Sequence, residues 1–543
     1  MPSIEELLLA SLSFASIQVS RGHLLQHAEQ IMRAYATSKA QLEFRFQGER
    51  GMGAGVTASF YSAVAAELRR RSVNLKAPMW VDSDTAGDKD GFVTHPMGLF
   101  PRPVPPVDVA GREWHQLRRV SLGRFRFLGR LAGRCLMDGQ VLPLPLASEF
   151  LQLALHMVEA GGIQETMQET TAATAEAWAS AEVGRGGSGG GDIAATDPAA
   201  APALSQGSLA ASVPLSLPDA AGTASAVGLR ASGAVALATT LFRLEDLPRL
   251  YGQPGTIVLA MYKAAGAAAS AATAAATAAT AATATAEAEV GTPGVIGGIE
   301  IGMNVGSSGS RSSSGMMLSA SPTMRGLPLD EWLAAAGLAF VDPLSNAPLI
   351  PGGAELEVRT ATDAGCFAAL VTSRWLGGGI VEVAEAFCLG LGEVAPLHKL
   401  MALTAAELRD QLCGEDAAEW PEDYLLQVVA PGSGYTRNSE PFRALLRCLS
   451  TMDAQTKRHF LTFVTGCPHL PPGGLGALTP PLEVTRKQGA AGAFATAEQI
   501  KAELPFARTC THTLHLPPYP SLDLTRAKLL YAMYNSRDVI DRD

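Results

Sequence analysis

Apolar residues recur at helical spacing over long parts of the chain and alternate at strand spacing in a few short ones. One apolar face near the start predicts that the first forty residues are helical. The strand-like sequence LEFRF at residues 42–46 ends this segment, and the glycine-rich sequence GERGMGAG at 48–55 follows as a predicted flexible turn. That loop lacks the Lys-Ser/Thr pair of a phosphate-binding P-loop. The residues on the apolar face are Leu24, Ala28, Ile31 and Met32.

Two more amphipathic helices are predicted in the first third of the chain. Residues 60–71 form one, and residues 125–139 form the other, which Gly139 ends. Cys135 falls on the apolar stripe of the second helix, together with Leu128 and Leu131. This cysteine is therefore predicted to lie in the core.

Two segments contain too few large apolar side chains for their burial to offset the loss of conformational entropy on folding. Residues 165–236 and 264–325 consist mainly of Ala, Thr, Gly and Ser, with almost no aromatic side chains. Both are predicted to be disordered insertions, although alanine favours transient helix in the second. The segment between them has normal complexity and is predicted to belong to the fold that the insertions interrupt.

Folded composition resumes at Leu327 and continues almost to the end of the chain. Residues 429–434 hold Pro431, Gly432 and Gly434, which predicts a flexible hinge between two folded parts. Beyond it, Leu514 and Leu516 alternate with polar residues in a short strand that two prolines end. A closing helix follows, for which Ser521 is the predicted N-cap.

Charge and hydropathy exclude two classes of partner. The formal net charge is −10 and no long block of like charges occurs, which argues against a nucleic-acid-binding face. No segment reaches the roughly 18 consecutive apolar residues of a membrane-spanning helix, and the N-terminus lacks the basic start of a secretory signal. The expected location is cytoplasmic, nuclear or both.

The seven cysteines are scattered and contain no CxxC pair, which indicates neither a disulfide framework nor a zinc site. Four of them lie in apolar runs and are predicted to be buried. Cys510 differs, because it precedes the short strand at a loop junction and follows Arg508, whose positive charge favours a thiolate. Cys510 is therefore the candidate nucleophile. The four predicted buried cysteines are Cys135, Cys388, Cys413 and Cys448.

The C-terminal region closely resembles the C-terminal lobe of HECT-type ubiquitin ligases. Its signature is a Leu-Pro, a Thr-Cys and a strand ending in Leu-Pro-x-Tyr, found here at 504–505, 509–510 and 516–519. The resemblance continues upstream through FLTFVTGCPHLPPGGLGAL, GYTRNS and TAAELRDQLCGEDAAEW, and in pieces through the region from residue 42. TPPLEVTRK and HLLQHAEQIM look most like the branch that contains the plant protein Kaktus and the animal thyroid-receptor-interacting ligases.

The resemblance implies an α+β fold in two lobes. A helical segment would span residues 1–41, and a larger, mainly helical N-lobe would span residues 42–428. The hinge would comprise residues 429–434. A small C-lobe, which contains the cysteine, would span residues 435–543. About forty residues precede the lobes, too few for a substrate-recruiting domain. Either partners bring the substrates, or the chain is the end of a longer product.

The resemblance also implies a reaction. Cys510 would accept ubiquitin from a ubiquitin-conjugating enzyme as a glycyl thioester, and a substrate lysine would then attack it. Thr509, Arg508 and His512 are candidate supporting residues, and neither a metal nor another cofactor is implied. The conjugating enzyme would dock on a small N-lobe subdomain that includes parts of residues 165–340.

Two departures from the family pattern keep an alternative open. Many relatives have His where this chain has Arg508, which cannot shuttle a proton, and a Phe where this chain has Ile540. The alternative is a HECT-like scaffold that binds ubiquitin or the conjugating enzyme but transfers weakly. A papain-like cysteine hydrolase is a third hypothesis, but no cysteine has the local signature of that family.

Overall fold

The computed structural model describes residues 14–49, 51–76, 78–83, 91–107, 111–159, 241–289, 323–416, 419–488 and 496–539. The chain divides into two compact units. The first contains residues 1–101, 120–241 and 381–543, and the second contains residues 102–119 and 242–380. The predicted insertion at 165–236 lies outside the described residues.

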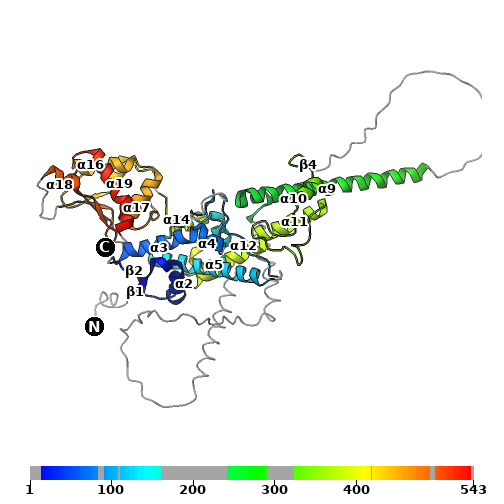
Figure 1. Cartoon of the computed structure of the whole chain (residues 1–543), viewed down its shortest axis with the longest axis horizontal. Coiled ribbons are helices and arrows are strands. Elements are labelled where there is room, and N and C mark those ends of the chain that lie inside the picture. Colours follow the sequence, from blue (N-terminus) through cyan, green and yellow to red (C-terminus); the bar gives the residue numbers. More distant parts are fainter. Residues whose placement is uncertain are drawn as a thin grey trace, which may run out of the picture. The chain divides into compact units, whose positions relative to one another are not determined.

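The N-terminal part is not wholly helical, because the range 1–41 predicted as a helical segment contains strand β1 (Phe14–Val19) and the first residue of β2 (Gln41–Phe46). The two strands pair in parallel, and Val19 lies opposite Phe46. Ser16 and Gln18 are exposed between less exposed apolar neighbours, a period-two pattern that favours a strand. A 3-10 turn (Arg21–His23) leads to helix α2 (Leu24–Tyr35), whose predicted apolar face is buried as expected. These elements are dark blue in Figure 1.

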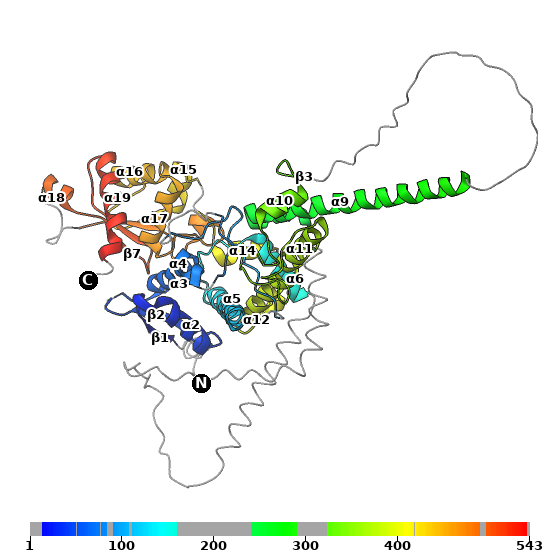
Figure 2. The ribbon, with the colours of Figure 1, turned by 45° about the vertical axis from the view of Figure 1, so that its right-hand side comes forward.

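Helices build the rest of the first part of this unit. The helices are α3 (Ala54–Arg69), α4 (Arg71–Lys76), α5 (Arg112–Asp138), α6 (Ser148–Glu159), α12 (Gly379–Gly392), α13 (Leu397–Leu400) and α14 (Ala405–Cys413). Two of them, α5 and α12, begin with residues of the second unit and lie side by side (Figure 2). They approach so closely that a Cβ added at Gly129 or at Gly390 would lie 2.0 Å from a carbonyl oxygen of the other helix. Glycine at these two positions is what allows the close packing.

The second unit is built around a long helix that runs into the alanine tract. Its elements are a 3-10 turn (Leu244–Asp246), α9 (Leu247–Glu289), β3 (Thr323–Met324), β4 (Leu327–Pro328), α10 (Leu329–Ala336), α11 (Ala361–Ser373) and a π-helical turn (Arg374–Gly378). The strands β3 and β4 form an antiparallel pair. In the core of the unit, the hydroxyl of Tyr251 donates to the carbonyl oxygen of Trp375 (2.6 Å), and the indole of Trp375 donates to the buried Asp342 (3.1 Å).

The alanine tract departs from the prediction of disorder at 264–325. Residues 264–289 continue α9, the long green helix of Figure 1, and residues 290–322 lie outside the described residues. The high helix propensity of alanine therefore outweighs the lack of large apolar side chains at the start of this segment. The segment before it does belong to the fold, since Leu247, Leu250 and Tyr251 are buried.

One described stretch, residues 361–392, is long and apolar enough to cross a membrane. Within its most apolar window, 72% of the residues are buried inside the protein. A core position accounts for this apolar composition.

The C-terminal part packs helices against one face of a four-stranded sheet with the order β5-β6-β8-β7. β5 (Ala430–Pro431), β6 (Glu483–Arg486) and β8 (Thr513–Leu516) are parallel, and β7 (Phe506–Arg508) is antiparallel to β8. The helices are α15 (Glu422–Val428), α16 (Glu440–Ser450), α17 (Ala454–Thr465), a 3-10 turn (Gly474–Ala477), α18 (Ala497–Ala502) and α19 (Leu522–Val539). Ser521 caps α19 as predicted, because its hydroxyl accepts from the Leu524 amide (3.3 Å).

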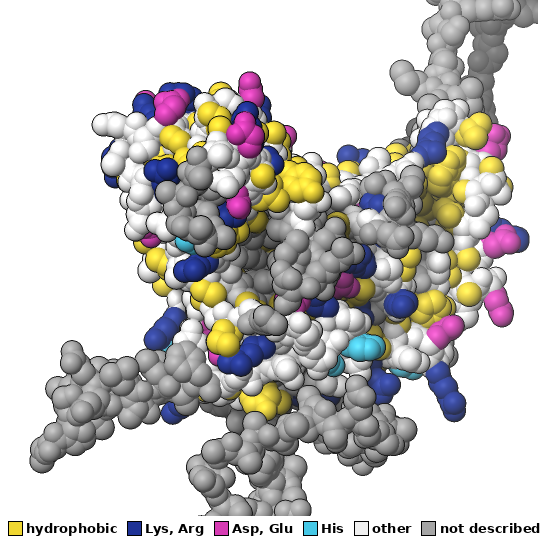
Figure 3. All heavy atoms as spheres, turned by 60° about the vertical axis from the view of Figure 1, so that its left-hand side comes forward, with side chains coloured by type: hydrophobic (Ala, Val, Ile, Leu, Met, Phe, Trp, Pro, Cys, Tyr) yellow, Lys and Arg dark blue, Asp and Glu magenta, His cyan; other side chains and the backbone are white. Residues whose placement is uncertain are grey.

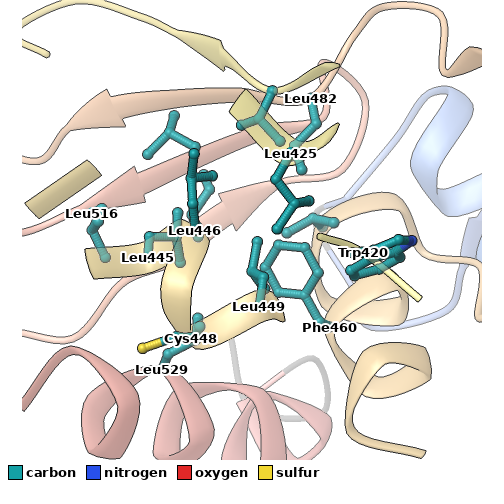
Figure 4. Packing of buried hydrophobic residues seen from close by; sticks show 14 of the residues in the cluster. Trp420, Leu425, Leu445, Leu446, Cys448, Leu449, Phe460, Leu482, Leu516 and Leu529 are labelled. Atoms are coloured by element: carbon teal, nitrogen blue, oxygen red, sulfur yellow. The ribbon is translucent and has the colours of Figure 1, made fainter. Parts of the chain in front are cut away.

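A single apolar cluster holds this part together, and Figure 4 shows its centre. Leu446 and Phe460 come from α16 and α17, while Leu514 and Leu516 come from the inner face of β8. Trp420 and Leu425 also belong to the cluster, although they precede the predicted start of the C-lobe at residue 435. Within the described residues the fold is thus a set of helices with small sheets, and α15 packs with the C-terminal part.

Candidate active site

Cys510 lies at the tip of a hairpin, in the turn that joins β7 to β8. Arg508 and Thr513 pair across the hairpin, and residues 509–512 form the turn. The cysteine is an exposed residue in this turn. The predicted position at a loop-strand junction is therefore confirmed.

The candidate supporting residues surround the cysteine without forming a catalytic dyad. His512 has a φ of 47°, and its Nδ1 lies 2.6 Å from the carbonyl oxygen of Pro480, to which it donates. The ring is therefore engaged with the backbone of another loop. Arg508 is exposed at the end of β7, and Thr509 is partly buried.

The sulfur of Cys510 contacts a loop that lies 458 residues earlier in the sequence. Its Sγ–H donates to the carbonyl oxygen of Met52, with Sγ and O 3.1 Å apart. A Cβ added at Gly53 would lie 3.2 Å from this sulfur, and one added at Gly55 would lie 2.0 Å from Thr509 Oγ1. Met52, Gly53 and Gly55, from the sequence predicted as a flexible turn, thus form one wall of the candidate site at the start of α3.

Most of the other cysteines differ from Cys510 because they are buried. Burial raises the pKa of Cys413 to about 12 and that of Cys467 to about 11, and it also raises the pKa values of Cys135, Cys388 and Cys448. These five side chains stay as thiols near neutral pH, which makes them poor nucleophiles. The prediction that four of them are buried is confirmed, and Cys467 is a fifth. Cys366, on α11, is exposed like Cys510 but lies in the second unit.

The predicted hinge residues Pro431, Gly432 and Gly434 lie at the edge of the sheet in this structure, and their role as a hinge stays a prediction. Pro431 belongs to β5, and the Gly432 amide donates to the carbonyl oxygen of Val484 (2.8 Å). Gly434 has a φ of 83° and packs on Arg486. The run resembles a linker in composition, but its glycines serve a close approach and a positive φ.

Proline at position 432 is expected to loosen the sheet. The substitution Gly432→Pro removes the hydrogen bond to Val484 and should lower the stability of the C-terminal part by about 2–3 kcal/mol. Gly432→Ala is the comparison, because it keeps the amide donor, although its added Cβ meets Glu483 Oε1 at 2.1 Å and Thr485 Cγ2 at 2.6 Å, so a smaller loss is expected for it as well. Urea unfolding should give a clearly higher free energy of unfolding for Gly432→Ala than for Gly432→Pro. Equal stabilities would mean that β5 adds nothing to the sheet.

Two histidines near the cysteine-bearing sheet favour the neutral state. Burial lowers the pKa of His515, and the nearby Arg508 lowers it further. The His515 ring stacks on Phe506 with centroids 4.3 Å apart, and its Nδ1 lies 2.8 Å from Thr485 Oγ1. Burial also lowers the pKa of His469, whose Nδ1 donates to the carbonyl oxygen of Cys413 (2.7 Å).

His469 should make folding sensitive to mild acid. Because its pKa is lower in the folded chain, the unfolded chain takes up the proton first as the pH falls below about 6.5. Stability is then lost toward acid, by at most about 1.4 kcal/mol per pH unit for one histidine. Urea unfolding at pH 7.5 and 5.5 should show a smaller loss for His469→Gln than for the parent chain. An equal loss in both would assign the effect to other groups.

The described residues contain no group of three or more His, Cys, Asp or Glu side chains arranged to hold a metal ion. On the face shown in Figure 3, basic and acidic side chains are interspersed rather than gathered by sign.

The sequence was compared with models of known protein families. Residues 317–539 match the model of the HECT domain, described as a ubiquitin-transferase. This part of the chain is a HECT domain. This confirms the predicted family, and the matched range includes Cys510 and the whole described sheet that positions it.

Three similar proteins illustrate the relationship. The chain is 26% identical over 95% of its length to the E3 ubiquitin-protein ligase TRIP12 of Danio rerio, and 26% identical over 95% to hecd-1 of Caenorhabditis elegans. It is 24% identical over 99% of its length to UPL3 of Arabidopsis thaliana. The chain spans 19%, 16% and 22% of the lengths of these three relatives, respectively.

Proposed function

We propose that the chain carries the catalytic domain of a ubiquitin-protein ligase with Cys510 as the acceptor of ubiquitin. The observation that carries the proposal is the exposed Cys510 at the tip of the β7–β8 hairpin, inside the matched HECT domain. A nucleophile there can meet two large carriers in turn, because the turn is exposed and a rigid sheet supports it.

The reaction divides into two acyl transfers. The thiolate of Cys510 attacks the carbonyl carbon of the thioester that joins ubiquitin to a conjugating enzyme; a new C–S bond forms, and the thiolate of that enzyme leaves. A substrate amine then attacks the new thioester, an amide bond forms, and the Cys510 thiolate leaves while the amine gives up a proton to solvent. The substrates and the chain linkage follow from neither step.

A HECT domain implies two protein partners, ubiquitin and a conjugating enzyme. We propose the second unit, residues 102–119 and 242–380, as the docking region for the conjugating enzyme. It forms a compact body of its own around α9 and α11, and it overlaps the region in which the docking subdomain is expected.

A single-turnover loading assay tests the proposal. The purified chain is mixed with ubiquitin-charged conjugating enzymes, and the products are separated without reducing agent. An adduct that a thiol reagent removes supports the ligase. A folded chain that binds a conjugating enzyme or ubiquitin, yet forms no adduct with a broad panel of conjugating enzymes, favours the alternative of a weakly active scaffold. Arg508 and Ile540, the two departures from the family pattern, favour that alternative.

A further inference from the structure

The turn that carries Cys510 contacts the start of α3 at several points. Thr509 fills the space beside Gly55, where the three atoms nearest an added Cβ all belong to Thr509, at 2.0, 2.4 and 2.8 Å. Beside this contact, the carbonyl oxygen of Gly466 accepts from the Ser62 hydroxyl of α3 (3.2 Å). We call the contact of residues 509–510 with residues 52–55 the cysteine seat.

The hydrogen bond in the cysteine seat exists only while the sulfur carries its proton. The carbonyl oxygen of Met52 is an acceptor and cannot donate, so Sγ must be the donor across the 3.1 Å separation. A thiolate at this position would face the negative end of the carbonyl dipole. The seat therefore accommodates the thiol, which is the form that does not attack.

An acylated sulfur does not fit the seat in the same way. A glycyl group on Sγ replaces the proton, so the hydrogen bond to Met52 is lost. The acyl carbon also needs space beside the sulfur, and on the side of α3 that space is small, because even a Cβ added at Gly53 would lie 3.2 Å from Sγ. The intimate packing of Thr509 on Gly55 leaves the turn little room to shift while it stays seated.

We infer that the cysteine seat is a resting contact that opposes ubiquitin loading, so that loading of Cys510 and release of residues 509–510 from the start of α3 accompany each other. This inference rests on the proposed function. By linkage, whatever weakens the seat makes loading easier, and a ubiquitin already on Cys510 holds the turn away from α3. The loading step itself is balanced as before: the thiol proton goes to solvent, the C–S bond forms on Cys510, and the conjugating-enzyme thiolate leaves and takes up a proton.

A matched pair of glycine substitutions tests the inference in the full chain. Gly55→Ala introduces a Cβ that meets only Thr509 among its three nearest atoms, and alanine suits the first turn of α3. Gly123→Ala is the control, because it also lies in a helix of the first unit and its added Cβ meets nothing within 4 Å. Circular dichroism should show that both variants keep the helical content of the parent chain.

The first measurement is the alkylation rate of Cys510 by iodoacetamide, read by mass spectrometry of the peptide. Gly55→Ala should raise this rate by about fivefold or more, which is within the range of typical coupling between two sites. Gly123→Ala should leave it unchanged. The exposed Cys366 is alkylated in the same sample and serves as an internal reference, with equal rates in all three proteins. An alkylation rate at Cys510 that is equal or lower in Gly55→Ala overturns the inference.

The second measurement is the rate of thioester formation from a charged conjugating enzyme. Gly55→Ala should load faster than the parent chain and the control, and slower loading overturns the inference that the seat opposes this step. The two proposals fail in distinguishable ways. Faster alkylation with no thioester on any of the three proteins supports the seat as a resting contact and contradicts the proposed function.

Discussion

Replacing Cys510 by alanine is expected to reduce formation of the ubiquitin adduct by at least about 1,000-fold, because the attacking sulfur is removed. Cys510→Ser should instead trap an adduct that thiol reagents leave intact and hydroxide cleaves, as an oxyester does. The measurement is a single-turnover assay on non-reducing and reducing gels.

Cys366→Ala is the matched control, because Cys366 is the other exposed cysteine among the described residues and lies in the second unit. It should load like the parent chain. Loss of the adduct in this control with retention in Cys510→Ala would move the acceptor to α11. If both variants kept the adduct, the acceptor would have to be one of the buried cysteines. Their raised pKa values argue against that role.

Replacing Phe460 by alanine is expected to have the largest effect on stability. The side chain is fully buried in the C-terminal cluster, where its ring lies 6.4 Å from that of Trp420 (Figure 4). Removing it leaves a cavity and should cost about 3–5 kcal/mol. Hydrogen exchange of peptides from residues 435–539, measured in the full chain, reports the loss as a lower opening free energy of this part.

Phe506→Ala provides the comparison within the same sheet. This side chain is 41% exposed and makes its ring contacts with His515 and Lys487. Its removal should cost about 1 kcal/mol or less. If the two variants opened with equal free energies, the cluster around Phe460 would not be the core that supports the hairpin.

Local pattern was enough to predict the elements that carry the cysteine. The alternation around Leu514 and the prolines after it predict β8, and a Ser521 cap predicts the start of α19; both are observed. Both signals act within a few residues, so the sequence displays them directly. The family resemblance depends on the same segment, and the match over residues 317–539 confirms it.

What could not be predicted depends on partners that are distant in sequence. Residues 430–431 form a strand only because β6, about fifty residues later, offers a free edge, so composition alone indicates a hinge. The seat of Cys510 on Met52 joins residues 458 positions apart, and neither residue type marks the contact. In the alanine tract the two local signals conflict, and helix propensity prevails over the disorder that low complexity indicates.

The strand order of the C-terminal sheet has a consequence for synthesis on the ribosome. β5 leaves the ribosome early, but it can pair only once β6 has been made. β6 in turn can pair with β8 only after the segment that carries the cysteine has been made, because β8 follows the cysteine in the chain. Leu529 and Met533 of α19 then complete the apolar cluster against helices made much earlier. A nascent chain that stops before α19 therefore exposes the unfinished cluster, which chaperones and proteases can recognise. The turn that carries Cys510 thus gains the support of the complete cluster only after nearly all of the C-terminal part has been translated.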